Sequence, residues 1–452
     1  MKVSAACLQR ALRAALVLWF WIVGTTLGWS QSTAVTLSEA SALMQSNELQ
    51  FEILDLEARV AEEAIRQAFG ERLPRVRLTM HYLYTYQEIV NQDNTTFQQG
   101  NSTYPTTRVA LRFEQPLYDA VKFRALPLAR AEGELISAQA EVARMELSRL
   151  LIDSFLGVAR AQFEVRQARA VLRARTQLAR DIGMLVDSGR VDVDQQLRAD
   201  GDTFAARADL SSAELGLTEA LFELRRFTGQ QVEAVRYGRG VGVAELRSFL
   251  GTFSREQLLQ NNPQIQVARA QVALAERQLE QVRGAFLPTA RITLDAEYEE
   301  TDGSLFGGGS TVQSADLGLE LNYSIYEGGV RSSRTREAEH NLDIAKLRLE
   351  QSEELAQRRY QALVEALQRS LEIVGAISRD QRIASERVEA AQVRMDAGSG
   401  ALEEVLDAEL RRDILEQRAQ ISRVRAIQLQ AEIYALFGAL DLEALSRDFA
   451  QT

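Results

Sequence analysis

Apolar and polar residues alternate with a period of two in four short segments of this chain. The apolar residues lie at even positions in the first and third segments, and mainly at odd positions in the second and fourth. Such alternation is typical of β-strands that have one apolar face and one polar face. The sequence therefore predicts strands over about 75–87, 107–118, 290–300 and 315–326.

The segments that follow each strand pair have the pattern of long helices. Leu363, Leu367 and Leu371 repeat at steps of four, which indicates one apolar seam of a packed helix. The stretch 120–185 has a single proline near its start, and 328–396 has none. Each stretch is long for a globular helix, and each is expected to turn back through a glycine tip into a shorter helix.

The order of these predicted elements occurs twice, which indicates an internal two-fold repeat. Leu73-Pro74 recurs as Leu287-Pro288, 214 residues later, and Tyr118-Asp119 recurs as Tyr326-Glu327, 208 residues later. A repeated order of elements restricts the fold more than any single motif does. We expect a signal peptide at 1–30, a first repeat at 31–229, an equatorial linker at 230–253, a second repeat at 254–438 and a tail at 439–452.

The first 30 residues have the three parts of a secretory signal peptide. Basic residues precede an apolar run at 14–23, and Gly28 and Ser30 follow it at positions suited to signal peptidase. An uncleaved anchor is the alternative, but the run is shorter than the ~20 residues that a membrane-spanning helix needs. Cys7 is the only cysteine and precedes the run, so we expect no disulfide in the mature chain.

The four predicted strands have the length and patterning of a membrane β-barrel. Each covers roughly the 9–11 residues that a tilted strand needs to cross a bilayer. The polar faces carry charged residues, which suits a water-filled lumen. Because four strands cannot close a barrel and lipid tolerates no open sheet edge, we expect several copies to share one barrel. An ordinary half-buried soluble sheet is the alternative.

Composition and charge narrow the function classes further. The chain has 52 Lys and Arg against 63 Asp and Glu, a net charge of −11, which argues against a nucleic-acid partner. No combination of a nucleophile, a base and an orienting acid is recognisable, so the sequence predicts no catalytic residue and no enzyme. His81, on the polar face of its strand, and His340 have no second ligand at metal spacing, so neither a metal nor a cofactor is expected.

Three further segments carry motifs. They are Ala285-Phe286-Leu287-Pro288 before a strand, Tyr326-Glu327-Gly328-Gly329 after one, and the glycine-tip segment 398–409. Together they resemble the TolC-like outer membrane efflux family, over about 36–440. The resemblance implies a membrane α+β fold in the outer membrane of a Gram-negative bacterium, with a large periplasmic part. It implies a homotrimer whose outer-membrane β-barrel, with four strands from each chain, continues as a long periplasmic α-helical barrel.

The resemblance also implies a function and partners. The chain is expected to be the passive exit duct of a tripartite efflux or type I secretion system. An inner-membrane pump would deliver substrates to it through a periplasmic adaptor (membrane fusion) protein, with outer membrane lipid around the barrel and no catalysis by this chain. A non-channel periplasmic helical scaffold is the competing hypothesis.

The resemblance places the periplasmic entrance at the tip of the second repeat. It implies an acidic ring from Glu404 and Asp407, which in three copies would favour cations. The simpler alternative is that both acids stabilise the N-terminus of a helix. Asp192 and Asp194 follow the first tip and are candidate partners of this ring.

Other tip residues bear on the latch and on docking. Met395 and Gly400 stand where some family members hold the entrance shut with tyrosine and arginine, so the resemblance does not identify the latch. The expected contacts with the adaptor are the tips themselves, Gly189 with Val191 and Gly398 with Leu402.

Overall fold

The computed structural model describes residues 34–88, 101–237, 248–249, 253–303, 308–440 and 442. The predicted signal peptide at 1–30, with Cys7, lies outside the described residues. So do most of the linker after residue 237, most of the tail and parts of both strand–strand loops.

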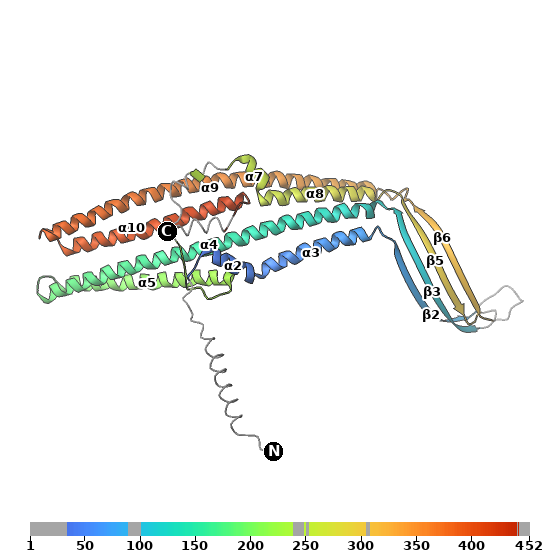
Figure 1. Cartoon of the computed structure of the whole chain (residues 1–452), viewed down its shortest axis with the longest axis horizontal. Helices are drawn as coiled ribbons and strands as arrows, with labels where there is room; N and C mark the ends of the chain where they lie inside the picture. Colours follow the sequence, from blue (N-terminus) through green and yellow to red (C-terminus); the bar gives the residue numbers. More distant parts are fainter. Residues whose placement is uncertain are drawn as a thin grey trace, which may run out of the picture.

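Two helices of unusual length run along an elongated molecule that has a sheet at one end, and α8 and α10 lie between them (Figure 1). They are α4 (Ala120–Asp187) and α9 (Val330–Asp396), of 68 and 67 residues. Each spans about 100 Å at the α-helical rise per residue. Shorter helices pack on them: α3 (Leu49–Gly70) and α8 (Pro263–Gly284) near the sheet, α5 (Val193–Thr228) and α10 (Leu402–Leu436) at the other end.

Local chemistry accounts for where the long helices begin. The Asp119 carboxylate accepts hydrogen bonds from the backbone amides of Val121 and Lys122, and so satisfies two amides that have no partner within α4. The start of α9 has no such side-chain cap and follows Gly329, whose φ of 85° favours glycine. The two long helices predicted from the sequence are therefore present.

Short elements surround the middle of the long helices, and we call them the collar. They are β1 (Ala34–Val35), α2 (Leu37–Asn47), β4 (Ala234–Val235) and α7 (Arg255–Asn261). Strand β1 pairs in parallel with β4, although almost 200 residues separate them in the chain. Thr36 and Ser254 form capping boxes that begin α2 and α7.

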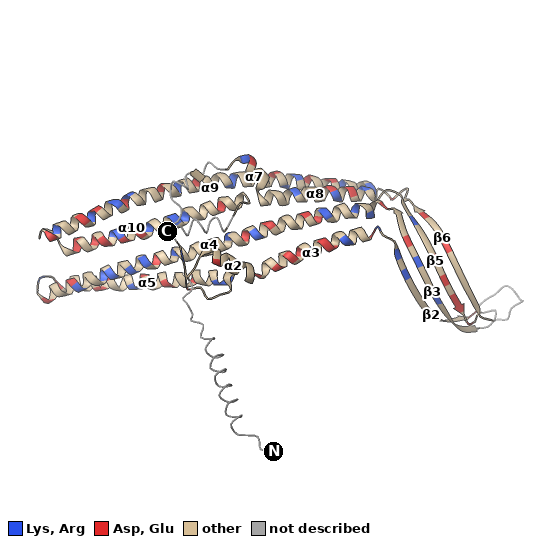
Figure 2. Ribbon diagram, viewed as in Figure 1, with Lys and Arg blue, Asp and Glu red and all other residues tan. Residues whose placement is uncertain are grey.

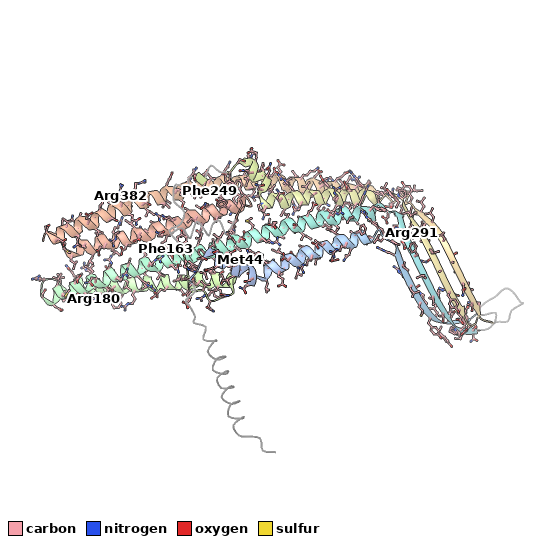
Figure 3. The ribbon with its side chains drawn as sticks, in the orientation of Figure 1. Met44, Phe163, Arg180, Phe249, Arg291 and Arg382 are labelled. Carbon is pink, nitrogen blue, oxygen red and sulfur yellow. The ribbon has the colours of Figure 1, made fainter. Side chains whose placement is uncertain are left out.

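The apolar core lies under the collar. One cluster joins Phe155 of α4 to Met44 of α2 and Ile427 of α10, all fully buried. A second cluster joins Leu367 of α9 to Ile265 of α8. Met44, Phe163 and Phe249 lie in this middle region (Figure 3). Helix α10 contributes residues to both clusters and so links α4 and α9 at mid-length.

A four-stranded antiparallel sheet forms one end of the molecule, in the order β2-β3-β5-β6. Its strands are β2 (Arg75–Glu88), β3 (Asn101–Tyr118), β5 (Thr289–Thr301) and β6 (Ser310–Asn322). The two hairpins are joined in the middle, by pairing of β3 with β5, which leaves β2 and β6 as the two edges.

The fourth strand differs from its prediction. The alternation predicted a strand over 315–326, whereas β6 begins at Ser310 and ends at Asn322. Its partner β5 begins at Thr289, opposite Asn322, so the residues after Asn322 have no partner strand within this chain. Alternation shows which face a residue takes, but it does not show where a neighbouring strand ends.

The two faces of the sheet differ in chemistry, as the alternation predicts. Large apolar side chains on one face are open to solvent in the single chain; Leu317 is 77% exposed and Leu319 is 72% exposed. The other face carries Arg, Asp and Glu that form ion pairs between adjacent strands. Charged residues recur along the strands in Figure 2. Across the described residues, none of the helices combines the length and apolarity that crossing a membrane requires.

Candidate functional site

Two helix–helix turns lie at the end of the molecule farthest from the sheet (Figure 1). We call the turn between α4 and α5 the first tip and the turn between α9 and α10 the second tip. Gly189 and Gly398 adopt φ angles of 69° and 73°, a left-handed conformation that favours glycine. At Gly400 a Cβ atom would lie 2.9 Å from the Met395 backbone nitrogen, so the close turn requires glycine there.

The second tip brings a cation to one of the predicted acids. Glu404 lies in the first turn of α10, and a guanidinium nitrogen of Arg394, at the end of α9, lies 3.3 Å from its carboxylate. Both side chains are about half exposed, at 52% and 54%, so the solvent weakens the pair. Asp407 lies one turn further along α10, is exposed, and forms no ion pair among the described residues.

The acids of the first tip are engaged on their own helix. The Asp192 carboxylate accepts a hydrogen bond from the Asp194 amide and caps α5. Asp194 forms an ion pair with Arg198, one turn further along. No hydrogen bond or ion pair among the described residues joins either acid to Glu404, so within one chain the structure does not bring the four predicted acids together.

The predicted docking residues are accessible at the two tips. Gly189 and Gly398 are exposed, Leu402 is 48% exposed, and Val191 is partly buried. They belong to different hairpins and form two separate points rather than one continuous patch within the single chain.

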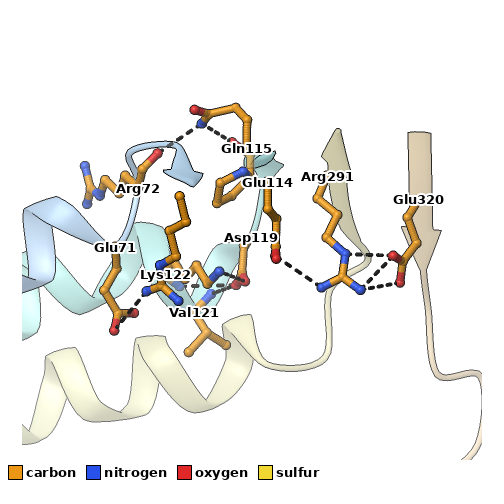
Figure 4. Close-up of polar contacts among 11 residues, drawn as sticks. Glu71, Arg72, Glu114, Gln115, Asp119, Val121, Lys122, Arg291 and Glu320 are labelled. Atoms are coloured by element: carbon orange, nitrogen blue, oxygen red, sulfur yellow. Dashed lines mark hydrogen bonds and ion pairs between the residues drawn. The ribbon is translucent and has the colours of Figure 1, made fainter. Parts of the chain in front are cut away.

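A ladder of ion pairs crosses the polar face of the sheet. Arg291 of β5 bonds Glu320 of β6 at 2.7 Å and reaches Glu114 of β3 at 3.3 Å (Figure 4). On the same face, Arg112 of β3 bonds Asp295 of β5. These pairs tie three of the four strands together through charges that remain partly exposed.

A groove near the tips separates α4 from α10. Arg173 and Arg180 line its α4 side, while Glu409 and Asp413 line its α10 side. Arg180 lies in the half of the molecule near the tips (Figure 3). The groove therefore carries opposite charges on its two walls.

A second polar group lies at mid-length, beside the collar. Arg149 of α4 bonds Glu146 at 2.6 Å and Asp153 at 2.5 Å. Burial raises the pKa of the Asp153 carboxyl, although Arg149 opposes that effect; the hydrogen bond from Arg149 lowers the pKa of Glu146. We assign this group to helix packing, because both acids share one cation on their own helix.

Metal binding has no support in the part of the chain that the structure describes. No group of three His, Cys, Asp or Glu side chains with metal-binding geometry occurs there. His81 lies on the polar face of β2 opposite Arg108, and His340 lies on α9.

Sequence reasoning missed Arg394. The signal was present, because a basic residue at the end of one helix and an acid at the start of the next must approach when a short glycine tip reverses the chain.

Comparisons with known proteins agree with the resemblance. The family model described as outer membrane efflux protein matches residues 255–439. The outer membrane protein TolC of Escherichia coli strain K12 is 24% identical over 449 residues, covering 93% of this chain and 86% of that protein. The alkaline protease secretion protein AprF of Pseudomonas aeruginosa is 23% identical, covering 72% and 68%.

Solved structures share the fold. The CmeC outer membrane channel of Campylobacter jejuni superposes with a TM-score of 0.73 at 14% identity, over 94% of this chain and 95% of that one. The outer membrane protein VceC of Vibrio cholerae gives a TM-score of 0.70 at 15% identity, over 90% and 97%.

Proposed function

This chain belongs to the TolC-like family of outer membrane efflux proteins, and on that premise we propose that it is the exit duct of a tripartite efflux or type I secretion system. As an outer membrane protein of a Gram-negative bacterium it has a large periplasmic part. In the proposed role it is passive: an inner-membrane pump supplies substrate, and a periplasmic adaptor connects the two.

The sheet is the observation that carries the proposal. One of its faces exposes apolar side chains that water would disfavour, and the other carries Arg291, Asp295 and Glu320. An apolar outer face and a charged inner face are what a water-filled membrane barrel requires. Three copies would supply twelve strands and so remove the two open edges that lipid cannot accept.

The helices extend the same duct into the periplasm. Long helices α4 and α9 leave the sheet together and reach the two tips about 100 Å away. Three copies side by side would enclose a helical tunnel. Mixed charges along the helices suit water on both sides of such a wall (Figure 2).

We propose that Glu404 and Asp407 form acidic rings at the periplasmic entrance of the trimer. Arg394 reduces the negative charge of the Glu404 ring through its ion pair. A ring of carboxylates attracts cations into a narrow pore. The Arg394–Glu404 contact lowers the net charge at one ring, whereas Asp407 has no ion-pair partner among the described residues. Asp192 and Asp194 are secondary candidates, since their present partners lie on α5.

Planar-bilayer recording of the detergent-purified protein tests the duct and the entrance together. Wild type is expected to give a small cation-selective conductance, and Glu404→Ala/Asp407→Ala a larger or less selective one. Removing Asp192 and Asp194 instead is the matched control at the first tip. Equal conductance and selectivity in wild type and Glu404→Ala/Asp407→Ala would mean that the gate does not lie at the second tip. A protein that neither inserts nor conducts, and extracts without detergent, would favour the periplasmic scaffold.

The tips are the proposed contacts for the adaptor. A photo-crosslinker at Leu402 or Val191 is expected to capture a periplasmic protein that co-purifies with an inner-membrane pump. The same crosslinker at Leu347, an exposed residue of α9 far from the tip, is the control. Equal capture from both positions would contradict docking at the tips.

A further inference from the structure

The two edges of the sheet are the least explained part of the molecule. Strands β2 and β6 each pair on one side only, and both expose apolar side chains. In the proposed duct each edge must pair with a second copy of this chain, because unpaired backbone groups are costly in lipid. The residues that meet at the seam between copies therefore depend on the proposed duct being assembled from several chains.

The two hairpins have the same internal register. Adding 214 to the residue on the first strand and 208 to the residue on the second converts every pair of the first hairpin, from Arg75–Glu114 to Gln87–Ser102, into a pair of the second hairpin. For example, Arg77 opposite Arg112 becomes Arg291 opposite Glu320, and both pairs are present in the sheet. The junction between the hairpins, β3 with β5, is therefore a template for the junction between β6 and β2 of the next copy.

The template converts one ion pair into another. Arg112 lies opposite Asp295 and bonds it. The same offsets turn Arg112 into Glu320 and Asp295 into His81. Both residues lie on the polar face of an edge strand and both are exposed in the single chain. An imidazole and a carboxylate would thus face each other where the template has a guanidinium and a carboxylate.

The shortened fourth strand supports the same template. The last residues of β3, after Glu114, have no partner in β2 and pair only with β5 across the junction. Their equivalents are 323–326, which are not strand in the single chain. Ile325 and Tyr326 are 84% and 85% exposed. These residues lack the neighbour that holds the end of β3 in place.

We propose that β6 of one copy pairs antiparallel with β2 of the next in the register that sets Glu320 opposite His81. The pairing extends β6 through 323–326, with Tyr323 opposite Leu78 on the apolar face and Asn322 opposite Thr79 on the polar face. A slip by one residue would expose apolar side chains to the lumen. A slip by two residues keeps the faces but separates His81 from Glu320.

Cysteine crosslinking tests this register in the full-length chain, with Cys7→Ser removing the one native thiol. His81→Cys/Glu320→Cys is the first variant, and Thr79→Cys/Asn322→Cys is a second in the same register should the first not fold. The Cβ atoms of directly opposite residues lie about 5 Å apart, which is close to the range of a disulfide. Residues displaced by four positions along the strand are too far apart to form one. Controls are Arg77→Cys/Glu320→Cys and Thr85→Cys/Glu320→Cys.

Mild oxidation of membranes, followed by non-reducing gel electrophoresis, is the measurement. We expect covalent dimers and trimers from the in-register variants, at a yield roughly tenfold above the controls because of the difference in Cβ separation. If a control crosslinks and the in-register variants do not, the proposed register is wrong, but the proposed function as a duct is not contradicted. Trimers and conductance without any in-register crosslink overturn the seam alone. If amine-reactive crosslinkers show that the protein is a monomer, both the seam and the proposed duct are wrong.

Discussion

At the scale of single residues, the charge balance of the second tip depends on one cation. Arg394 is the basic residue that contacts Glu404, and it belongs to α9 while the acids belong to α10. A partly exposed pair of this kind contributes little to stability, on the order of 1 kcal/mol or less. Its larger effect is electrostatic, because it sets how negative the proposed entrance is.

Removing that cation is expected to change ion selectivity more than folding. Arg394→Ala should raise the preference for cations in bilayer recordings by up to a few-fold, because no positive charge then offsets that of the Glu404 carboxylate. Arg387→Ala removes the same charge about two turns away on α9 and is the control. An equal rise in both variants would mean that general charge, rather than the Arg394–Glu404 contact, governs the entrance.

The Glu39 carboxyl at the start of α2 makes the stability of the chain depend on pH. The backbone hydrogen bond from Thr36 lowers the pKa of Glu39 below 4.5. A carboxyl whose folded pKa is lowered contributes stability above its unfolded pKa, and this contribution is lost as pH falls through the folded value. Glu39→Gln should therefore lower the free energy of unfolding, by about 1 kcal/mol or less at neutral pH.

Thermal unfolding in detergent, followed by circular dichroism from pH 7 down to pH 3, measures this difference. The gap between wild type and Glu39→Gln should close below about pH 4.5 as Glu39 becomes protonated. A gap that stays constant over this range would show that the amide loses packing or hydrogen bonding unrelated to charge.

At the scale of elements, the long helices are stabilised where the collar packs on them. Leu367 is fully buried in α9, whereas Leu347 on the same helix is 64% exposed. Leu367→Ala should lower the free energy of unfolding by ~2–5 kcal/mol, and Leu347→Ala by less than about 1 kcal/mol. Denaturant unfolding of both variants measures the contrast. Equal losses would show that a neighbouring copy buries Leu347.

The sequence predicted elements better than it predicted their ends. The seam through Leu363, Leu367 and Leu371 correctly indicated a helix, because its residues face one core. Strand β6 ends at Asn322, four residues before its predicted end, because a strand's length depends on a partner that its own alternation cannot describe. Arg394 was missed for a related reason: the contact is made by a turn, across residues that are not periodic.

At the scale of the whole molecule, the sheet separates lipid from water in the proposed duct. Neighbouring positions on β5 test this division, because Leu294 lies on the apolar face and Thr293 on the polar face. Leu294→Arg should cost ~2–4 kcal/mol near the bilayer midplane, and Thr293→Arg much less. Membrane fractionation should find less integrated Leu294→Arg protein. Equal integration of both variants would contradict the assignment of the faces.

The overall architecture could be predicted because its signals are repeated. Alternation in four segments and a doubled element order indicated the sheet and the paired long helices, and the structure contains both. The proposed site could be predicted only by analogy, since acids such as Glu404 and Asp192 are also ordinary residues of a helix start. Within one chain they stay apart, and only an assembly would bring copies of them together.

The parallel pair of β1 with β4 has a consequence for biogenesis. A secreted chain emerges N-terminus first, so Ala34 and Val35 reach the periplasm long before their partners Ala234 and Val235. Contacts so distant in sequence form late, because a long loop must close before they give any stabilisation. Strand β1 therefore cannot pair with β4 until the first half of the chain has been exported. This part of the collar is completed only after both strands have reached the periplasm.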